Sequence, residues 1–328
     1  MQIEIIKPGM LSTVQDLGRT QSRGNAVPVS GAMDTLSARV ANLALGNEQT
    51  AAVIEFTYAD AIFKAQTDLL IAWSGDGAIL QSDGQMLPAD RPLLIPQGKT
   101  IKLINNPTGC RTYLAVAGGW NVPEVLGSKS TYITAGFGGL EGRAFRKGDV
   151  LQTFGNQSET NVKFCDTLTG AKINYPRWSI ARPLFLPADR KLIRVMPGPE
   201  ADWFDADAIA SFYSAPYRVG SRSNRMGIGL EGEKVKRKIQ TELLSTAVTP
   251  GTIQVTNNND MILLMADCQT TGGYPRIAQV AAVDLPLCAQ LKPGDEIRFQ
   301  QITRQEAERL LVQRERELRR LNQDLLDF

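Results

Sequence analysis

The densest group of side chains suited to chemistry lies in residues 267–276, with the sequence Asp-Cys-Gln-Thr-Thr-Gly-Gly-Tyr-Pro-Arg. An apolar stretch typical of a buried strand precedes it, so we expect a loop at that strand's end. Gly272 and Gly273 let backbone N–H groups approach a ligand closely. Thr270 and Thr271 add hydroxyls that can donate hydrogen bonds. These features predict a binding site for a small anion.

Four other side chains of the same segment could act on a bound molecule. The Arg276 guanidinium can donate two parallel hydrogen bonds to a carboxylate or phosphate. Asp267 is our candidate base or metal-orienting carboxylate, Gln269 would recognise an amide, and Tyr274 would add a contact. The alternative is a tight turn with threonine caps and a surface arginine. We favour a functional site because so many ligand-capable groups fall together.

A second group lies before a helix predicted for residues 35–45. Ser30, Gly31 and Asp34 belong to the loop that leads into this helix. A helix N-terminus presents free N–H groups and a partial positive charge, which suit an anion or a developing oxyanion. The alternative assigns Asp34 to the N-cap and Ser30 with Gly31 to a turn.

A third group is the glycine-punctuated segment 223–232, which contains Arg225. This arginine could bind an anion as part of the catalytic set, or pair structurally with Glu231 or Glu233. Residues 127–131, Gly-Ser-Lys-Ser-Thr, look like the end of a phosphate-binding loop, but the lysine follows serine and the upstream glycine is missing. We therefore expect this chain to hold no nucleotide by a standard motif.

The absence of histidine narrows the chemistry further. It excludes a Ser-His-Asp triad, a Cys-His pair and histidine metal ligands from this polypeptide. The four cysteines never form Cys-x-x-Cys, so we expect free thiols, no disulfide framework and no metal site. Acid–base work must then come from Asp, Glu, Lys, Tyr or a partner's side chain.

Composition also limits the kinds of partner. Lys and Arg total 36 against 34 Asp and Glu, and this balance gives no electrostatic case for nucleic acid. No apolar run approaches the ~20 residues of a membrane helix, and the N-terminal residues lack the pattern of a signal peptide. We expect a cytoplasmic protein that binds small molecules and other proteins, with no membrane segment.

Most of the chain is predicted to form short strands separated by turns, a mainly β (α+β) fold with few helices. Each half has a buried-type strand leading to a Gly-Gly loop and, later, a Gly-Asp turn before another strand. Two similar β-barrel-like domains would explain this echo, and chance similarity is the alternative. We place the domains at residues 1–155 and 191–303, with a connector at 156–190 and a C-terminal helix at 304–328.

The C-terminal stretch is predicted to form a long amphipathic helix. Its apolar positions fall at four-and-three spacing, with Arg314 at one seam position, and they are Leu311, Leu318, Leu321, Leu325 and Phe328. Such a stripe packs on its own domain in the simplest interpretation. Docking of a partner or a second copy is the alternative.

These segments, in this order, resemble the family of allophanate hydrolase subunit 2, also called biotin-dependent carboxyltransferase-like proteins. The resemblance extends to about residue 299 and rests on Gln-Thr-Thr-Gly-Gly-Tyr at 269–274 and Ser-Gly-Ala-Met-Asp at 30–34. Further matching stretches are residues 13–19 with 28–34, 41–42 with 46–47, 113–119, 126–128 with 130–131, 223–232, 251–255 and 293–299. Where the family usually has Ser-Asp-Arg-Met-Gly-Tyr-Arg-Leu, this chain has Asn224, Ile228 and Gly229 in place of the acid, the aromatic residue and the second arginine.

The resemblance implies two cyclophilin-like β-barrel domains and a partner, a subunit-1 or B homologue, that shares the active site. The first function that it implies is ATP-dependent activation of the 5-oxoproline lactam for hydrolysis to glutamate, with an A subunit that completes the ring opening. ATP with Mg²⁺ would be shared with the partner. Arg276, Arg225 and the amides of Gly272 and Gly273 would stabilise the developing charge.

Two other functions stay open from the same resemblance. A carboxyltransferase component of a urea-carboxylase-like enzyme would depend on a separate biotin carrier. A non-catalytic antagonist would sequester a kinase-inhibiting subunit-1 homologue and turn over no substrate.

Overall fold

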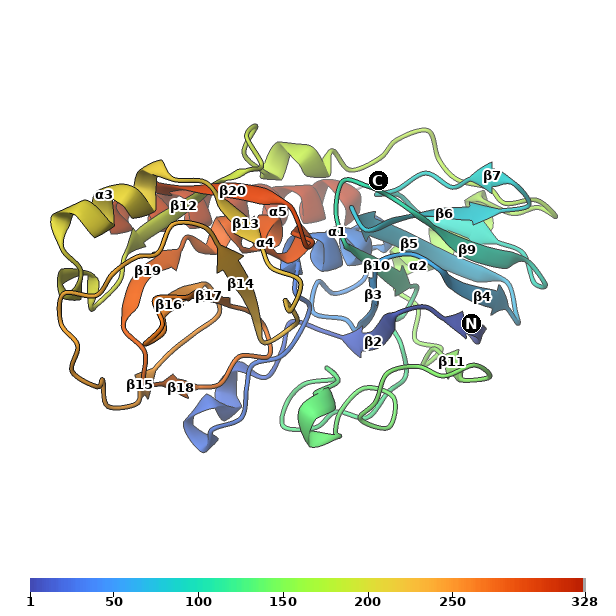
Figure 1. Cartoon of the computed structure of the whole chain (residues 1–328). Coiled ribbons are helices and arrows are strands. Elements are labelled where there is room, and N and C mark those ends of the chain that lie inside the picture. The colour runs from blue at the N-terminus through green and yellow to red at the C-terminus, as the bar shows by residue number, and fades with distance from the viewer. Residues whose placement is uncertain (327–328) are drawn as a thin grey trace. The chain divides into compact units, whose positions relative to one another are not determined.

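The computed structural model describes residues 1–326. Its chain forms two compact units. Unit 1 comprises Met1–Arg19, Ser30–Leu184 and the C-terminal segment from Leu318, and unit 2 comprises Thr20–Val29 and Phe185–Glu317. Over residues 1–326 more residues lie in strands than in helices (Figure 1), which confirms the predicted mainly β fold with few helices.

Unit 1 contains two antiparallel sheets. The larger sheet has the strand order β11 (Val150–Gln152), β1 (Gln2–Pro8), β4 (Ala61–Ala65), β9 (Thr100–Asn105), β6 (Ala78–Ser82) and β7 (Gln85–Met86). The smaller sheet has the order β2 (Leu11–Gln15), β3 (Val53–Thr57), β10 (Arg111–Val116), β5 (Leu69–Gly75) and β8 (Leu93–Ile95). One apolar core draws side chains from both sheets, including Ile3, Phe63, Trp73 and Leu114. The strands of this half therefore lie in two sheets that enclose a common core.

Helix α1 (Thr35–Leu45) packs on β5 and β10 of the smaller sheet. Because β5 is covered by the core on one face and by α1 on the other, all of its residues are buried. Asp34 caps the helix by accepting a hydrogen bond from the Ser37 N–H, and Gly46 ends it in the left-handed conformation with φ of 70°. The helix predicted for residues 35–45 is confirmed.

The region predicted as a connector, residues 156–190, folds mostly as part of unit 1. It contains α2 (Glu159–Thr167), which begins at a capping box formed by Ser158 and Asn161. Further along, the buried Arg182 forms an ion pair with the partly buried Asp76. Most of this region is therefore packed structure and not a bare linker.

Unit 2 is built around a closed β-barrel of seven strands. Their order is β12 (Leu192–Pro197), β19 (Arg276–Val280), β16 (Thr252–Val255), β17 (Met261–Leu264), β14 (Gly227–Glu231), β13 (Tyr217–Val219) and β20 (Glu296–Gln301). The parallel pairing of β12 with β20 closes the barrel, and the other neighbours pair antiparallel. The barrel expected for the second half is confirmed.

Residues of the barrel strands alternate between the interior and the outer face. In β14, Ile228 and Leu230 are buried, whereas Gly227 and Gly229 are partly exposed. The register sets Gly229 opposite Ile262 of β17, and Ile262 in turn opposite Gln254 of β16. Gly229, Ile262 and Gln254 therefore share the outer face of the barrel.

Shorter elements connect and cover these sheets. In unit 2 they are η1 (Thr20–Asn25), η4 (Ala201–Trp203), α3 (Ala206–Ser214), η5 (Ala282–Asp284), α4 (Leu285–Gln290) and the small hairpin of β15 (Thr246–Ala247) with β18 (Thr271–Gly272). Elsewhere the chain forms η2 (Ile133–Ala135) and η3 (Arg182–Phe185). Helix α3 packs on β20, where the Phe212 and Phe299 rings stack with centroids 4.8 Å apart.

The predicted C-terminal helix is present as α5 (Arg304–Leu326). Within unit 2, Ala307 joins a small apolar cluster with Val283, and Leu311 packs against that cluster. The buried Arg314 guanidinium donates a hydrogen bond of 2.9 Å to the Val283 carbonyl, which explains an arginine at a seam position. The first part of the stripe therefore packs on its own unit, and Phe328 lies outside the described residues.

No helix within residues 1–326 is both long and apolar enough to cross a membrane.

All four cysteines are free, and three of them, Cys110, Cys268 and Cys288, are buried. Burial raises the pKa of the Cys268 thiol to about 12 and also raises the pKa of Cys288. We predict that iodoacetamide at about pH 8 labels the more exposed Cys165 first and the other three only after unfolding, because the thiolate is the reacting form. Peptide mass spectrometry would measure the order, and prompt labelling of Cys268 in the folded protein would contradict it.

Candidate functional site

Residues 267–276 form a loop after β17, as the sequence predicts. Within it, β18 pairs with β15, and the Val248 N–H donates to the Thr270 carbonyl at 3.0 Å. Thr270, Thr271 and Gly272 are thus used in a small hairpin that fixes the course of the loop. Gly273 and Tyr274 follow it at the surface.

Arg225 and Asp267, two of the three predicted catalytic residues, form a buried ion pair. The Arg225 Nε lies 2.8 Å from Asp267 Oδ2, and its Nη2 lies 3.0 Å from Oδ1. The Asp267 N–H also donates to the Arg225 carbonyl at 2.9 Å. A two-pronged charged contact of this kind holds both side chains in one geometry, so it ties the segment before β14 to the start of the 267–276 loop.

Arg276, the third predicted catalytic residue, is paired with Glu200. Its Nε lies 2.7 Å from Glu200 Oε2, its backbone N–H donates to the same oxygen at 3.1 Å, and its Nη1 donates to the Ala247 carbonyl at 2.7 Å. Burial alone would raise the pKa of Glu200, but the hydrogen bonds from Arg276 outweigh this effect and lower that pKa. The far end of the loop is therefore fixed by a second ion pair.

All three predicted catalytic side chains thus hold the ends of the loop in place. Their engagement in ion pairs is a structural role that the sequence alone does not distinguish from a catalytic one. Their catalytic roles stay predictions.

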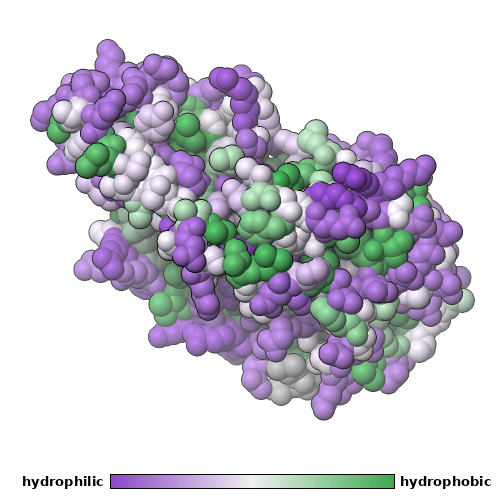
Figure 2. Space-filling view, turned by 90° about the horizontal axis from the view of Figure 1, so that it is seen from below, coloured by the Kyte–Doolittle hydropathy of each residue, from purple (hydrophilic) through white to green (hydrophobic). Residues whose placement is uncertain are grey.

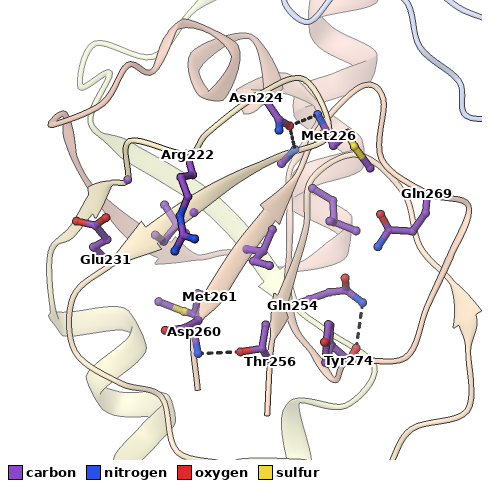
Figure 3. Close-up of a pocket in the computed structure, with 16 residues that line it drawn as sticks. Arg222, Asn224, Met226, Glu231, Gln254, Thr256, Asp260, Met261, Gln269 and Tyr274 are labelled. Carbon is purple, nitrogen blue, oxygen red and sulfur yellow. Dashed lines mark hydrogen bonds between the residues drawn. The ribbon is translucent and has the colours of Figure 1, made fainter. Parts of the chain in front are cut away.

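A groove of about 600 Å³ lies on the outer face of the barrel, over β14, β17 and β16 (Figure 3). Two of the predicted ligand-binding residues, Gln269 and Tyr274, line it. The sequence analysis proposed no ligand contact for its other polar lining residues, which are Arg222, Asn224, Glu231, Gln254, Thr256 and Asp260. The 267–276 loop forms one wall of this groove.

The floor of the groove is open because β14 presents two glycines there. A Cβ added at Gly229 would have no atom within 4 Å, and the backbone at this residue is not left-handed. Neither packing nor backbone conformation therefore requires glycine at this position. What the glycine provides is room in the groove.

Gln254 is the most buried polar side chain of the groove, with 1% of its surface exposed. Its Nε2 donates to the Tyr274 carbonyl at 3.1 Å, while its Oε1 accepts no hydrogen bond from residues 1–326. A Cβ at Gly272 would come within 2.6 Å of this Nε2, so a larger residue there would displace the end of the Gln254 side chain. The absence of a side chain at Gly272 therefore allows Gln254 its observed position in the groove.

Asn224 and Gln269 add two further side-chain amides to the groove. Asn224 Oδ1 accepts a hydrogen bond from the Met226 N–H at 2.7 Å. The NH₂ group of the same side chain has no hydrogen-bond partner in the described chain. Gln269 is exposed and lies across the groove from Arg222 and Glu231 in Figure 3. Amide donors and an amide acceptor around one hollow can recognise a ligand that carries an amide of its own.

The second predicted site, before α1, lies in unit 1. The Met33 N–H donates to Glu55 Oε2 at 2.8 Å, and the Asp34 N–H donates to the Tyr113 hydroxyl at 2.8 Å. The same hydroxyl donates to Glu55 at 2.8 Å, and burial followed by the Glu55 charge raises the pKa of Tyr113. Groups of the chain itself satisfy these N–H donors, so the observed contacts fit the N-cap interpretation.

Ser30 and Gly31 form the turn that precedes these groups. A Cβ at Gly31, where φ is 84°, would lie 2.8 Å from the Gly18 nitrogen, so the close approach of two loops requires glycine. Ser30 also has a positive φ, and its Oγ is buried with no hydrogen-bond partner in the described part of the chain. Their predicted anion-binding role stays a prediction.

The segment that looks like a phosphate-binding loop holds an internal carboxylate instead. Asp16 accepts hydrogen bonds from the Ser128 and Ser130 hydroxyls at 2.6 and 2.5 Å and from the Lys129 N–H at 2.6 Å. The donors that a phosphate would need are therefore turned toward Asp16.

The comparisons with known proteins agree with one another. The family described as "Carboxyltransferase domain, subdomain A and B" matches residues 25–301. The C subunit of the 5-oxoprolinase of Escherichia coli is 37% identical over 305 residues, 93% of each chain. A protein of the same name from Haemophilus influenzae is 32% identical over 308 residues, 94% of each chain.

A solved structure shares the fold. The urea carboxylase of Kluyveromyces lactis superposes with a TM-score of 0.86 at 28% identity, over 98% of this chain and 29% of that chain. The chain therefore spans less than a third of that larger protein.

The Glu200–Arg276 pair yields a prediction about stability. Replacing either residue by Ala leaves a partly buried charge unpaired, so each single change should lower the free energy of unfolding by about 2–4 kcal/mol. The double variant should cost less than the sum of the two, whereas Arg298→Ala, at an exposed position on β20, should change stability by about 0.5 kcal/mol or less. Denaturant unfolding measures all four variants.

The same pair sets a pH dependence. Because the pKa of Glu200 is lower in the folded protein, its stabilising effect is present above the carboxyl's unfolded pKa and is lost as pH falls through the folded pKa. The stability gap between the wild type and Glu200→Gln should therefore narrow on acidification. In the denaturant experiment, an Arg276→Ala variant as stable as the wild type would contradict the stabilising role of the Glu200–Arg276 ion pair.

Proposed function

Because this chain belongs to the family of carboxyltransferase domains with subdomains A and B, we propose that it acts as the C subunit of a 5-oxoprolinase. One observation carries this proposal. The two relatives with that name align along more than nine-tenths of their own length and of this chain, so their whole architecture is shared. The reaction would be the ATP-dependent hydrolysis of the 5-oxoproline lactam to glutamate.

The groove does not fit a magnesium nucleotide. Arg222 is the one cation of its lining, and of its two acids Asp260 pairs with Lys234. Within residues 1–326 no three His, Cys, Asp or Glu side chains form a group able to hold a metal ion. We therefore assign ATP with Mg²⁺ mainly to the partner subunit, where ATP would supply the activation of the lactam oxygen.

This chain's own contribution is to bind and orient the lactam. The carboxamides of Gln254 and Gln269 can pair with the N–H and C=O of a cyclic amide. The ion pairs Arg225–Asp267 and Glu200–Arg276 then act as positioning devices, because they hold the loop that carries Gln269 and Tyr274. Precise placement of a reactant accounts for a large part of many rate enhancements.

The proposal includes partners and a location. A subunit-1 or B homologue would share the active site, and an A subunit would complete the ring opening. Large apolar side chains at the surface, such as Leu244 at 87% exposure, and the hydrophobic patches between hydrophilic ones in Figure 2 suit docking of another protein. Four free thiols agree with a reducing cytoplasm.

A carboxyltransferase role in a urea-carboxylase-like enzyme is the second candidate, favoured by the shared fold of the yeast urea carboxylase. It would require a biotin carrier and urea. A non-catalytic antagonist of a kinase inhibitor is the third candidate, and it would bind a subunit-1 homologue without turnover.

Reconstitution distinguishes the three functions. We predict that this chain with its B and A partners releases glutamate and ADP from 5-oxoproline and ATP, and that omission of this chain lowers the rate to background. Coupled assays for both products measure the rate, with urea and a biotinylated carrier as the second substrate arm. Carboxylation of urea alone, or tight partner binding with no turnover of either substrate, would contradict the 5-oxoprolinase assignment.

A further inference from the structure

Arg222 differs from the other arginines near the groove because its charge is not already engaged. It lies in the loop between β13 and β14, is exposed, and makes no ion pair or hydrogen bond with any residue of the described chain. Figure 3 shows its side chain extending from the rim into the groove. Arg225 and Arg276, by contrast, are tied to Asp267 and Glu200.

No side chain fills the floor of the groove at Gly229. Gly229 lines the same groove, and a side chain there would extend into open space. Glu231 also lines the groove but lies toward its edge in Figure 3 and forms no ion pair with Arg222. A free guanidinium above an empty floor is suited to an anionic group of a ligand.

The opposite part of the groove is neutral and made of amides. The buried Gln254 has an unpartnered Oε1 acceptor, and Gln269 has an NH₂ donor without a partner in residues 1–326. Asn224, in the loop that carries Arg222, adds a further NH₂ donor. A lactam presents the complementary pair, an N–H donor and a C=O acceptor. One end of the groove therefore suits a carboxylate and the other a cyclic amide.

We infer that this groove is a binding site for a small carboxylic acid that carries a ring amide, with Arg222 as the carboxylate anchor and Gly229 as the residue that sets ligand size. The inference rests on the proposed function in that it gives the lactam substrate a site. It also separates two candidate substrates, because urea has no carboxylate and would not use Arg222.

The test compares ligands that differ by one group. Calorimetry on the full chain, and on its complex with the B partner, measures binding of 5-oxoproline, of 2-pyrrolidinone, which lacks the carboxylate, and of proline, which lacks the lactam carbonyl. We predict that Arg222→Gln weakens 5-oxoproline binding about 10- to 100-fold, the usual value of a charged hydrogen-bonded contact, and leaves 2-pyrrolidinone unchanged. In turnover, the change should appear in KM more than in kcat.

Two matched controls accompany this variant. Arg218→Gln removes an exposed arginine of β13 that does not line the groove and should leave binding unchanged. Gly229→Leu should exclude the ligand without unfolding the barrel, whereas Gly24→Leu, also with open space around its Cβ, should have no effect on binding. Unchanged thermal midpoints would show that the variants are folded.

Equal binding of 5-oxoproline by the wild type and Arg222→Gln would overturn the inference, as would the absence of binding of all three ligands by both the chain and the complex. Turnover of 5-oxoproline with a KM that Arg222→Gln does not change would overturn it and leave the proposed function standing. Arg222-dependent binding of lactam acids without any turnover would support the site and contradict the proposed function.

Discussion

The two ion pairs at the ends of the 267–276 loop are the constraint on which the candidate site depends. Arg225 with Asp267 and Arg276 with Glu200 fix a polar, glycine-containing loop that has little apolar surface of its own to bury. Each pair has a backbone hydrogen bond beside it, so a displacement of the side chains would also shift the main chain. Breaking either pair would leave a charge poorly solvated, and this cost keeps the loop in one geometry. These contacts therefore attach both ends of the groove wall to the barrel.

A closed barrel supplies the rest of the site through the alternation of its strands. Apolar residues such as Ile228 and Leu263 fill the interior, and their neighbours on the outer face are free to form a recognition surface. On this face β14 has glycines, and β16 has a buried amide, Gln254. The glycines leave volume for a ligand, and the burial of Gln254 fixes the direction of the hydrogen bonds that its amide can form.

Sequence patterns within short segments predicted individual helices and strands. They could not predict which side chains far apart in the sequence would pair. The cap at Asp34, the glycine at position 46 and the apolar spacing between them are contained in one short segment, and the helix appeared where expected. The partner of Arg276 is 76 residues away, so only the folded barrel could reveal that a predicted catalytic group is engaged in an ion pair. Gln254 carried a signal that could have been used, a long polar side chain between the apolar residues Ile253 and Val255 of a strand. Arg222 carried none, because an exposed arginine has no sequence mark that separates a ligand anchor from a solvated charge.

The most direct measurement of the central claim is hydrogen–deuterium exchange of the chain in its reconstituted complex, with and without 5-oxoproline. If the outer face of the barrel holds the ligand, exchange should slow in peptides that cover β14 and residues 267–276 and stay unchanged in residues 30–34. Slowed exchange at residues 30–34, with none over the barrel groove, would contradict the account.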